Sequence, residues 1–278
     1  MTDGDANLAV GDIALMRTRV TAKGLDFEMV RVGGFRSIVE LLANLGHDPE
    51  PVLKARGLTL EMLRDPEGVV PLSKVLRLFT ASVRASRLPH FGLMAGARNG
   101  LSTLGLFGYL AQTAPDVRTG LEDLIGFLFV HDRFARVRLN AEGETAALDY
   151  IFDYPTAAGA EHGADFVIAA IAKMVRGLCG EEWGPSRVRL PRRSPANAAP
   201  YREMFKSEVV FGADFGSIEF SAHWLSRPLP GSNESLRFYL LDLVRQASRA
   251  ADSEAERVRQ IIRTQLVPLH SDPDGLMS

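Results

Sequence analysis

The side chains best suited to chemistry are six histidines and one cysteine, and none of them falls in a catalytic or metal-binding motif. The sequence contains no G-x-S-x-G, no P-loop and no H-E-x-x-H. The histidines lack the paired spacing of zinc ligands, at His47, His90, His131, His162, His223 and His270. We therefore expect no enzyme activity, no metal ion and no cofactor.

A small-molecule site is the binding chemistry that these residues can supply. A few polar groups in an apolar, aromatic cavity are typical of such sites. We expect the ligand-binding residues to be His90, Met94, Phe107, Phe127, His131, Arg133, Tyr150 and Phe166. Two alternatives stay open: the aromatic residues fill the core, and His131 and Arg133 cap the end of a helix.

Charge argues against a nucleic-acid surface on this chain. The net charge is −2 and the pI is about 6.3. One short basic run, formed by Arg187, Arg189, Arg192 and Arg193, is expected to be a solvated strand edge and loop.

Hydrophobic periodicity predicts helices in the first half of the chain. Apolar residues recur at helical spacing from Arg36 to Gly46, from Pro71 to Arg84 and from Asp116 to Val130, with shorter helices at Pro51–Arg56 and Thr59–Arg64. Glycines at Gly92, Gly96, Gly105 and Gly108 either allow helices to pack closely or leave room for a ligand, and close packing is the simpler explanation.

The period then changes from 3.6 to 2, which predicts strands. Phe134–Asn140 and Thr145–Asp153 form an expected hairpin, and a long helix, Gly163–Leu178, follows. Next come a strand at Arg187–Leu190, a short helix at Pro200–Phe205 and an expected second hairpin of Glu208–Phe211 with Ser217–Phe220. Helices followed by a mostly antiparallel sheet indicate an α+β fold.

Two amphipathic helices are expected after Pro230, within residues 231–268. The first has an apolar stripe that fits either its own domain or a second copy of the chain, formed by Leu236, Tyr239, Leu240, Leu243, Val244 and Ala247. We assign these residues to dimerisation. We expect residues 1–25 to be a flexible arm, 26–230 a regulatory domain and 269–278 the start of a linker.

A set of structural residues gives the chain a resemblance to the AraC/XylS transcriptional regulators, specifically to their arabinose-binding-domain-like effector module. The motifs are Gly46-His47-Asp48-Pro49, Phe91-Gly92-Leu93, Leu104–Tyr109, Trp183–Pro185, Tyr201, Phe205, Phe211, Phe220 and Arg227–Pro230. The resemblance implies a small-molecule effector, a homodimer formed by the following helix, and DNA binding through a C-terminal helix-turn-helix domain.

That DNA-binding domain is missing from the sequence, which favours a chain cut before it over a natural short form. The lining that we expect suits an apolar or amphipathic effector, or an amino-acid derivative, better than a free sugar. Alternatives are a haem or other small-molecule sensor or an enzyme on a similar fold, and a module that only dimerises. One cysteine, no signal peptide and no membrane-length apolar run predict a cytoplasmic protein with no membrane partner.

Overall fold

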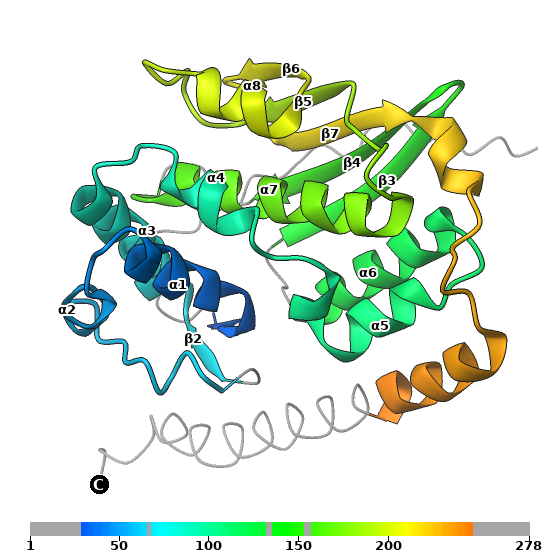
Figure 1. The fold of residues 1–278 in the computed structure, drawn as a ribbon, viewed down its shortest axis with the longest axis horizontal. Coiled ribbons are helices and arrows are strands. Elements are labelled where there is room, and N and C mark those ends of the chain that lie inside the picture. The colour runs from blue at the N-terminus through cyan, green and yellow to red at the C-terminus, as the bar shows by residue number, and fades with distance from the viewer. Residues whose placement is uncertain (1–28, 66–67, 132–134, 153–156, 247–278) are drawn as a thin grey trace, which may run out of the picture.

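The structure is a computed structural model that describes residues 29–65, 68–131, 135–152 and 157–246. Figure 1 shows helices gathered on one side and a five-stranded sheet on the other, with helices packed on the sheet. This arrangement confirms the predicted α+β fold.

The first part of the chain is helical, as predicted. Its helices are α1 (Arg36–Asn44), α2 (Pro49–Lys54), α3 (Leu72–Ser86) and α4 (Phe91–Gly96), with a 3-10 turn η2 (Gly33–Phe35) before α1. A small antiparallel pair, β1 (Met29–Arg31) and β2 (Val69–Pro71), adds to this part. The helices enclose a core that includes Ile38, Leu41, Leu42, Phe79 and Phe91, which we call the N-terminal core.

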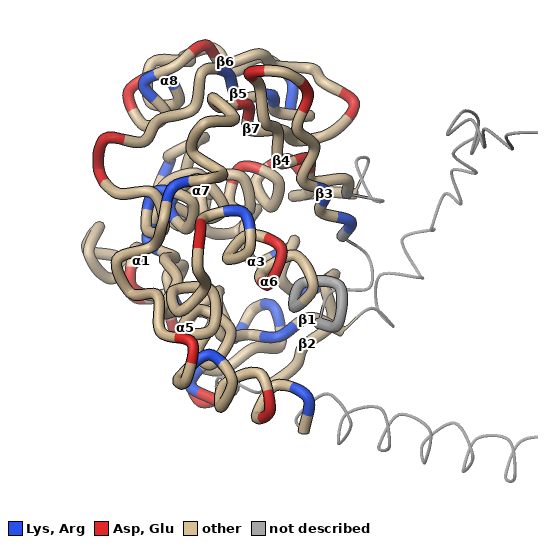
Figure 2. Tube along the Cα trace, turned by 90° about the vertical axis from the view of Figure 1, so that its right-hand side faces the viewer, with Lys and Arg blue, Asp and Glu red and all other residues tan. Residues whose placement is uncertain are grey.

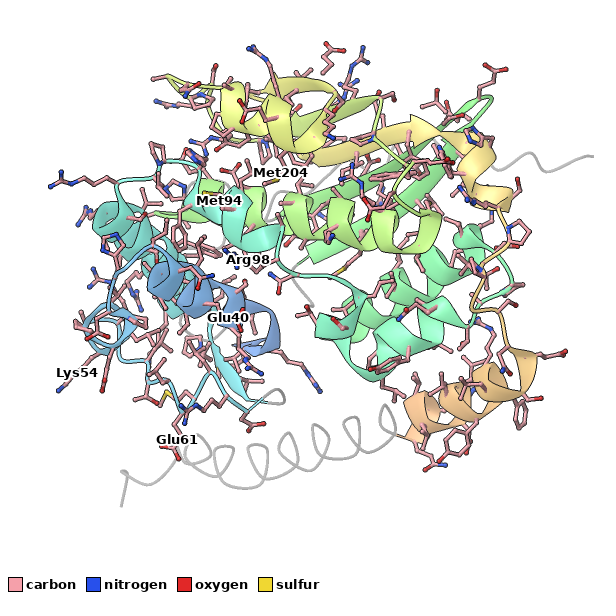
Figure 3. All side chains as sticks on the ribbon, viewed as in Figure 1. Glu40, Lys54, Glu61, Met94, Arg98 and Met204 are labelled. Atoms are coloured by element: carbon pink, nitrogen blue, oxygen red, sulfur yellow. The ribbon has the colours of Figure 1, made fainter. Side chains whose placement is uncertain are left out.

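The expected helix at Thr59–Arg64 is wrong, because the chain forms turns there. The Thr59 hydroxyl accepts a hydrogen bond from the Met62 backbone N–H, at 3.1 Å. This is the bond that an N-cap threonine makes, but the turns that follow it do not continue as a helix. The charged side chains of Lys54 and Glu61 in this region point outward, away from the core (Figure 3).

Three helical segments link the two parts of the fold: η3 (Leu101–Leu104), α5 (Leu106–Gln112) and α6 (Val117–His131). The Asp116 carboxylate accepts the Thr119 backbone N–H at 2.8 Å, so it caps α6 as the sequence indicates.

The sheet contains β3 (Ala135–Glu142), β4 (Thr145–Phe152), β5 (Arg187–Leu190), β6 (Glu208–Phe211) and β7 (Gly216–Ser221), with α8 (Ala199–Phe205) between β5 and β6. The strand order is β3-β4-β7-β5-β6. The hairpin of β3 with β4 is confirmed. The second expected hairpin is wrong: β5 lies between β6 and β7, parallel to β6 and antiparallel to β7.

Helix α7 (Ala160–Cys179) joins the two cores (Figure 1). Phe166, in its first half, packs into the N-terminal core against Phe35 and Phe79. Ile168, Val175 and Cys179, further along the helix, belong to a second core beneath the sheet, which we call the sheet core. Thirteen of its twenty residues are buried, so α7 is the central helix of the fold.

The crossing of α4 and α7 depends on two glycines. A Cβ atom on Gly92 would lie 2.2 Å from the His162 carbonyl oxygen, and one on Gly96 would lie 2.1 Å from that of Phe166. No side chain fits in such a gap. Close helix packing therefore explains Gly92 and Gly96. It was the simpler of the two explanations that the sequence offered, the other being room for a ligand.

The last described element is a helix over residues 234–246, which follows the 3-10 helix η4 (Ala222–Ser226). Arg237 binds Asp123 of α6 through both terminal nitrogens, at 2.6 and 3.0 Å. Asn233 caps the helix by accepting the Leu236 N–H at 2.9 Å. This helix is thus attached to the domain through α6.

Charges of both signs are interspersed over the described chain (Figure 2). On the sheet, Glu219 pairs with Arg189 at 2.7 Å and with Arg187 at 3.4 Å, and Arg187 also pairs with Glu208 at 2.8 Å. These two arginines of the basic run are therefore ion-paired, and the expected strand edge is wrong, because β5 lies inside the sheet. In the described ranges, no helix combines the length and the apolar character needed to span a membrane.

Candidate functional site

A buried polar cluster lies where α7 meets the connection from β5 to α8. Arg192 donates from Nη1 to Asp165 Oδ2 and to the Tyr201 hydroxyl oxygen. The Tyr201 hydroxyl donates to the same Asp165 oxygen at 2.8 Å. Arg192, Asp165 and Tyr201 are 7%, 0% and 1% exposed, so their polar groups depend on hydrogen bonds within the protein. We call these residues the Asp165 cluster.

Local structure positions each member of the cluster. Asp165 lies on the buried face of α7, three residues before Ile168, and Tyr201 lies in the first turn of α8, four residues before buried Phe205. Arg192 follows β5, where its carbonyl accepts the Gly212 N–H at 2.8 Å. Gly212 has a φ of +77°, a conformation that favours glycine.

Burial dominates the ionisation of the cluster. It raises the pKa of Asp165 to about 7 and outweighs the opposing effects of the Arg192 charge and of the hydrogen bonds from Tyr201 and Arg192. For Arg192, burial acts to lower the pKa, but the charge of Asp165 and the interaction with Tyr201 raise it overall. Burial also raises the pKa of Tyr201. Near neutral pH, Arg192 is thus charged, Tyr201 is neutral, and Asp165 is the group that titrates.

Two histidines lie within the electrostatic influence of Arg192. Burial lowers the pKa of His162, which the Glu161 charge opposes and the Arg192 charge reinforces. Burial and then Arg192 lower the pKa of His90, which precedes α4. Both imidazoles are therefore predominantly neutral at pH 7.

Two buried polar atoms in this region have no hydrogen-bond partner within the described part of the chain: Asp165 Oδ1 and His162 Nδ1. The other ring nitrogen of His162, Nε2, lies 3.7 Å from Glu161 Oε1. Unpartnered buried polar atoms are uncommon in folded proteins because each one costs free energy. Asp165 Oδ1 and His162 Nδ1 therefore have hydrogen-bonding capacity that no described residue uses.

A small pocket opens beside the cluster. Its walls are Ala160, Glu161, Ala164, Pro191, Arg192, Asp214 and Phe215. These residues come from the start of α7, the end of β5 and the connection from β6 to β7. Arg192 is the residue that the pocket and the buried cluster share.

The residues predicted from sequence to bind a ligand are distributed over both cores. Met94 and Phe166 pack in the N-terminal core, and Tyr150 is 5% exposed in the sheet core. Figure 3 labels Met94 on α4; it also labels Met204, a residue of α8 that packs on the sheet core. Phe107 is half-buried on α5. Phe127 and His131 belong to α6, but their side chains, like Arg133 as a whole, lie outside the described residues. Within this set, burial and then the Arg192 charge lower the pKa of His90.

The sequence analysis missed Asp165 and Tyr201 as polar site residues, and its expectation for Arg192 was wrong. Arg192 is not solvated, because it is held inside the protein by an aspartate that lies 27 positions earlier. One signal was available: Asp165 is a charged residue on the apolar stripe of a helix, between Ala164 and Phe166.

The predicted dimerisation stripe divides between two environments. Leu240 is 8% exposed and packs on its own domain, and Leu243 and Val244 are half-buried. Leu236 and Tyr239 are 45% and 60% exposed. Ala247 lies outside the described residues. Within the ranges given above, no three His, Cys, Asp or Glu side chains are grouped to hold a metal ion.

Comparison with known proteins adds a family assignment. The family described as "Arabinose-binding domain of AraC transcription regulator, N-term" matches residues 46–229. The HTH-type transcriptional regulator VirS of Mycobacterium tuberculosis is 27% identical over 206 residues, which cover 72% of this chain and 60% of the relative. An ornithine utilization regulator of Pseudomonas aeruginosa is 22% identical over 206 residues, covering 74% and 61%.

The fold has a counterpart among solved structures. The transcriptional regulator CdpR from Pseudomonas aeruginosa matches with a TM-score of 0.57 and 21% identity, over 76% of this chain and 62% of that one. At that identity the match concerns the fold alone. The chain spans about 60% of the length of the curated relatives it matches.

Proposed function

The chain belongs to the AraC family of transcription regulators, as an arabinose-binding-like effector domain, and we propose that it binds a small effector beside Arg192 and transmits binding through α7 to a dimer-forming helix over residues 234–246. The family is one of regulators and not of enzymes. In this proposal the domain acts in the cytoplasm, and a C-terminal domain outside this chain contacts DNA.

The observation that carries the proposal is the shared position of Arg192. The charged side chain of Arg192 is buried, with hydrogen bonds to Asp165 and Tyr201, yet it also forms a wall of the pocket. Unpartnered Asp165 Oδ1 lies in the same cluster. Buried polar groups that meet a concave surface are typical of ligand sites, because they fix the orientation of a bound molecule.

A continuous chain of contacts leads from the pocket to the last described helix. The pocket lies at the start of α7, and Leu178 near the end of α7 approaches Gly120 of α6, next to Leu229. Further along α6, Asp123 holds Arg237. A ligand that binds one arrangement of α7 better than another would shift the population of arrangements of this helix.

The exposed part of the stripe supports self-association. Leu236 and Tyr239 lie on the solvent side of a helix that Arg237 and Leu240 attach to the domain. We assign residues 26–230 to the effector domain and 231–268 to dimerisation and linkage. The ligand set predicted around His90 stays a prediction, and it defines a competing, more apolar site.

The test is mass spectrometry of small molecules released when the purified chain is denatured, compared with a mock purification and with the Arg192→Lys variant. We expect a stoichiometric compound that the wild-type chain retains and the variant retains less. A domain that releases no compound and shows no thermal shift with any candidate effector contradicts sensing and supports a module that only dimerises.

A further inference from the structure

Arg192 has hydrogen-bonding capacity left over for a ligand. Its Nη1 donates hydrogen bonds to Asp165 and Tyr201, and its Nε donates to the Arg193 carbonyl at 3.4 Å. Its Nη2 makes no hydrogen bond within the described residues and is not among the buried unpartnered atoms. Because Arg192 forms part of the pocket wall, Nη2 is the donor that it offers there. Guanidinium groups form strong, charge-assisted hydrogen bonds with carboxylates and phosphates.

The guanidinium is also held in place before any ligand arrives. Asp165 and Tyr201 bind it on one side, and its central carbon lies 5.2 Å from the centre of the Tyr201 ring. A donor that is fixed in advance loses little conformational entropy on binding. The first residue of the twenty-residue helix α7, Ala160, lines the same pocket, and the positive end of a helix dipole attracts an anion.

The opposite charge is present in the same pocket. Glu161 and Asp214 both line it and both are exposed residues. A ligand with only a carboxylate would be repelled by them, and a ligand with only an amine would leave the Arg192 donor unused. The pocket therefore favours a molecule that carries both charges a short distance apart.

The remaining walls are small or apolar. Ala160 and Ala164 leave space at the start of α7, and Pro191 and the 37% exposed ring of Phe215 complete the lining. Such walls suit a short side chain attached to a zwitterionic head better than a sugar ring, which needs many hydrogen-bonding partners.

We propose that the pocket beside Arg192 binds a free α-amino acid, with its carboxylate on Arg192 and its ammonium group at the carboxylates of Glu161 and Asp214. This inference rests on the proposed sensor function and names the class of its effector.

The first experiment measures binding of the twenty common L-amino acids to the whole chain by thermal shift and calorimetry. For each amino acid that binds, the corresponding amine without the carboxylate and the N-acetyl derivative without the positive charge are compared. We expect each loss of a charged group to weaken binding at least about tenfold, as the loss of a charge-assisted hydrogen bond implies. Equal affinity for the amine or for the N-acetyl derivative would overturn the proposal.

Variants that change only charge locate the site. Glu161→Gln and Asp214→Asn each remove one negative charge from the pocket lining, and we expect weaker amino-acid binding, with the thermal midpoint of each ligand-free variant measured alongside. Glu203→Gln, on an exposed position of α8 outside the pocket walls, is the matched control and keeps full affinity. Amino-acid binding that none of the pocket variants weakens would place the ligand elsewhere and overturn the proposal.

The two proposals fail differently. Release or binding of a compound of another class, such as a lipid, with no binding of any amino acid, rejects the amino-acid assignment and leaves the sensor function standing. Absence of any bound or binding compound in both experiments rejects the sensor function itself, and the amino-acid assignment with it.

Discussion

Arg192 and Arg193 are neighbours in sequence, but their environments differ completely: the first is buried against Asp165 and the second is exposed. We expect Arg192→Ala to lower the free energy of unfolding by about 3–5 kcal/mol, because it leaves a buried carboxyl group without its partner. Arg193→Ala is the control and should change it by less than about 0.5 kcal/mol. Denaturant unfolding of both variants measures the difference, and equal effects would contradict the buried pair.

Asp165 makes stability depend on pH. Its pKa is about 7 in the folded chain, against 3.8 as the ordinary value. Between these values the folded state keeps a proton that the unfolded state has lost, so the stability contributed by protonated Asp165 falls as pH rises from about 4 to 7 and then levels off. Asp165→Asn lacks this titration, whereas the opposing titration of His162 is present in both proteins.

We therefore expect the thermal midpoint of the wild-type chain, relative to Asp165→Asn, to be higher at pH 5 than at pH 8 by about 2 °C or more. Calorimetry across this range measures it. A difference that does not vary with pH would show that Asp165 keeps an ordinary pKa.

At this scale the sequence predicted little of the site. Four arginines within seven residues look alike, and only the fold decides that Arg187 and Arg189 meet glutamates of neighbouring strands while Arg192 reaches α7. Contacts between positions that are far apart in sequence are not encoded in local spacing. Tyr201 was identified only as a structural residue of the family resemblance, and the partner of its hydroxyl was not visible in the sequence.

At the scale of elements, the crossing of α4 and α7 is the contact most sensitive to substitution. We expect Gly96→Ala to lower the free energy of unfolding by about 1–3 kcal/mol, because its Cβ would meet the Phe166 backbone. Gly126→Ala, in α6, is the control: nothing lies within 4 Å of its Cβ position, so the better helix propensity of alanine should leave stability equal or higher by up to about 1 kcal/mol. Thermal unfolding of both variants decides this, and a tolerated Gly96→Ala would contradict the close crossing.

Element types were predictable because periodicity is local, whereas strand order was not. The β3–β4 hairpin follows from two alternating segments and a short turn. The β6–β7 connection is also short enough for a hairpin. It nevertheless passes over the end of β5, where the Ala213 N–H bonds to the Leu190 carbonyl at 3.1 Å. Crossing one strand requires a span of about 10 Å, which four residues provide. Loop length alone therefore cannot distinguish a hairpin from a connection that skips one strand.

For the whole molecule, the exposed stripe of the helix over residues 234–246 determines the expected assembly. We expect Leu236→Asp and Tyr239→Asp to convert a dimer into monomers with an unchanged thermal midpoint, since both side chains are exposed within one chain and a charge would be buried at the interface. Leu240→Asp does not test this, because Leu240 packs on its own domain.

Sedimentation at matched concentrations measures the change, with Ser235→Asp as a control at an exposed position of the same helix. A wild-type chain that is monomeric at all concentrations, or variants that remain dimeric, would remove this helix from the interface.

The reactivity of the single cysteine, Cys179, reports how often the helix between the two cores opens to solvent. Cys179 ends the helix that joins them, is 2% exposed, and burial raises the pKa of its thiol to about 12 against the opposing charge of Arg227. A thiol in this state does not react with iodoacetamide until the protein opens. Alkylation kinetics, followed by intact mass, will therefore report opening of α7 at one site without engineered probes. We expect a bound effector to slow the labelling and Arg192→Ala to accelerate it, and a rate equal to that of the unfolded chain would contradict the burial of Cys179.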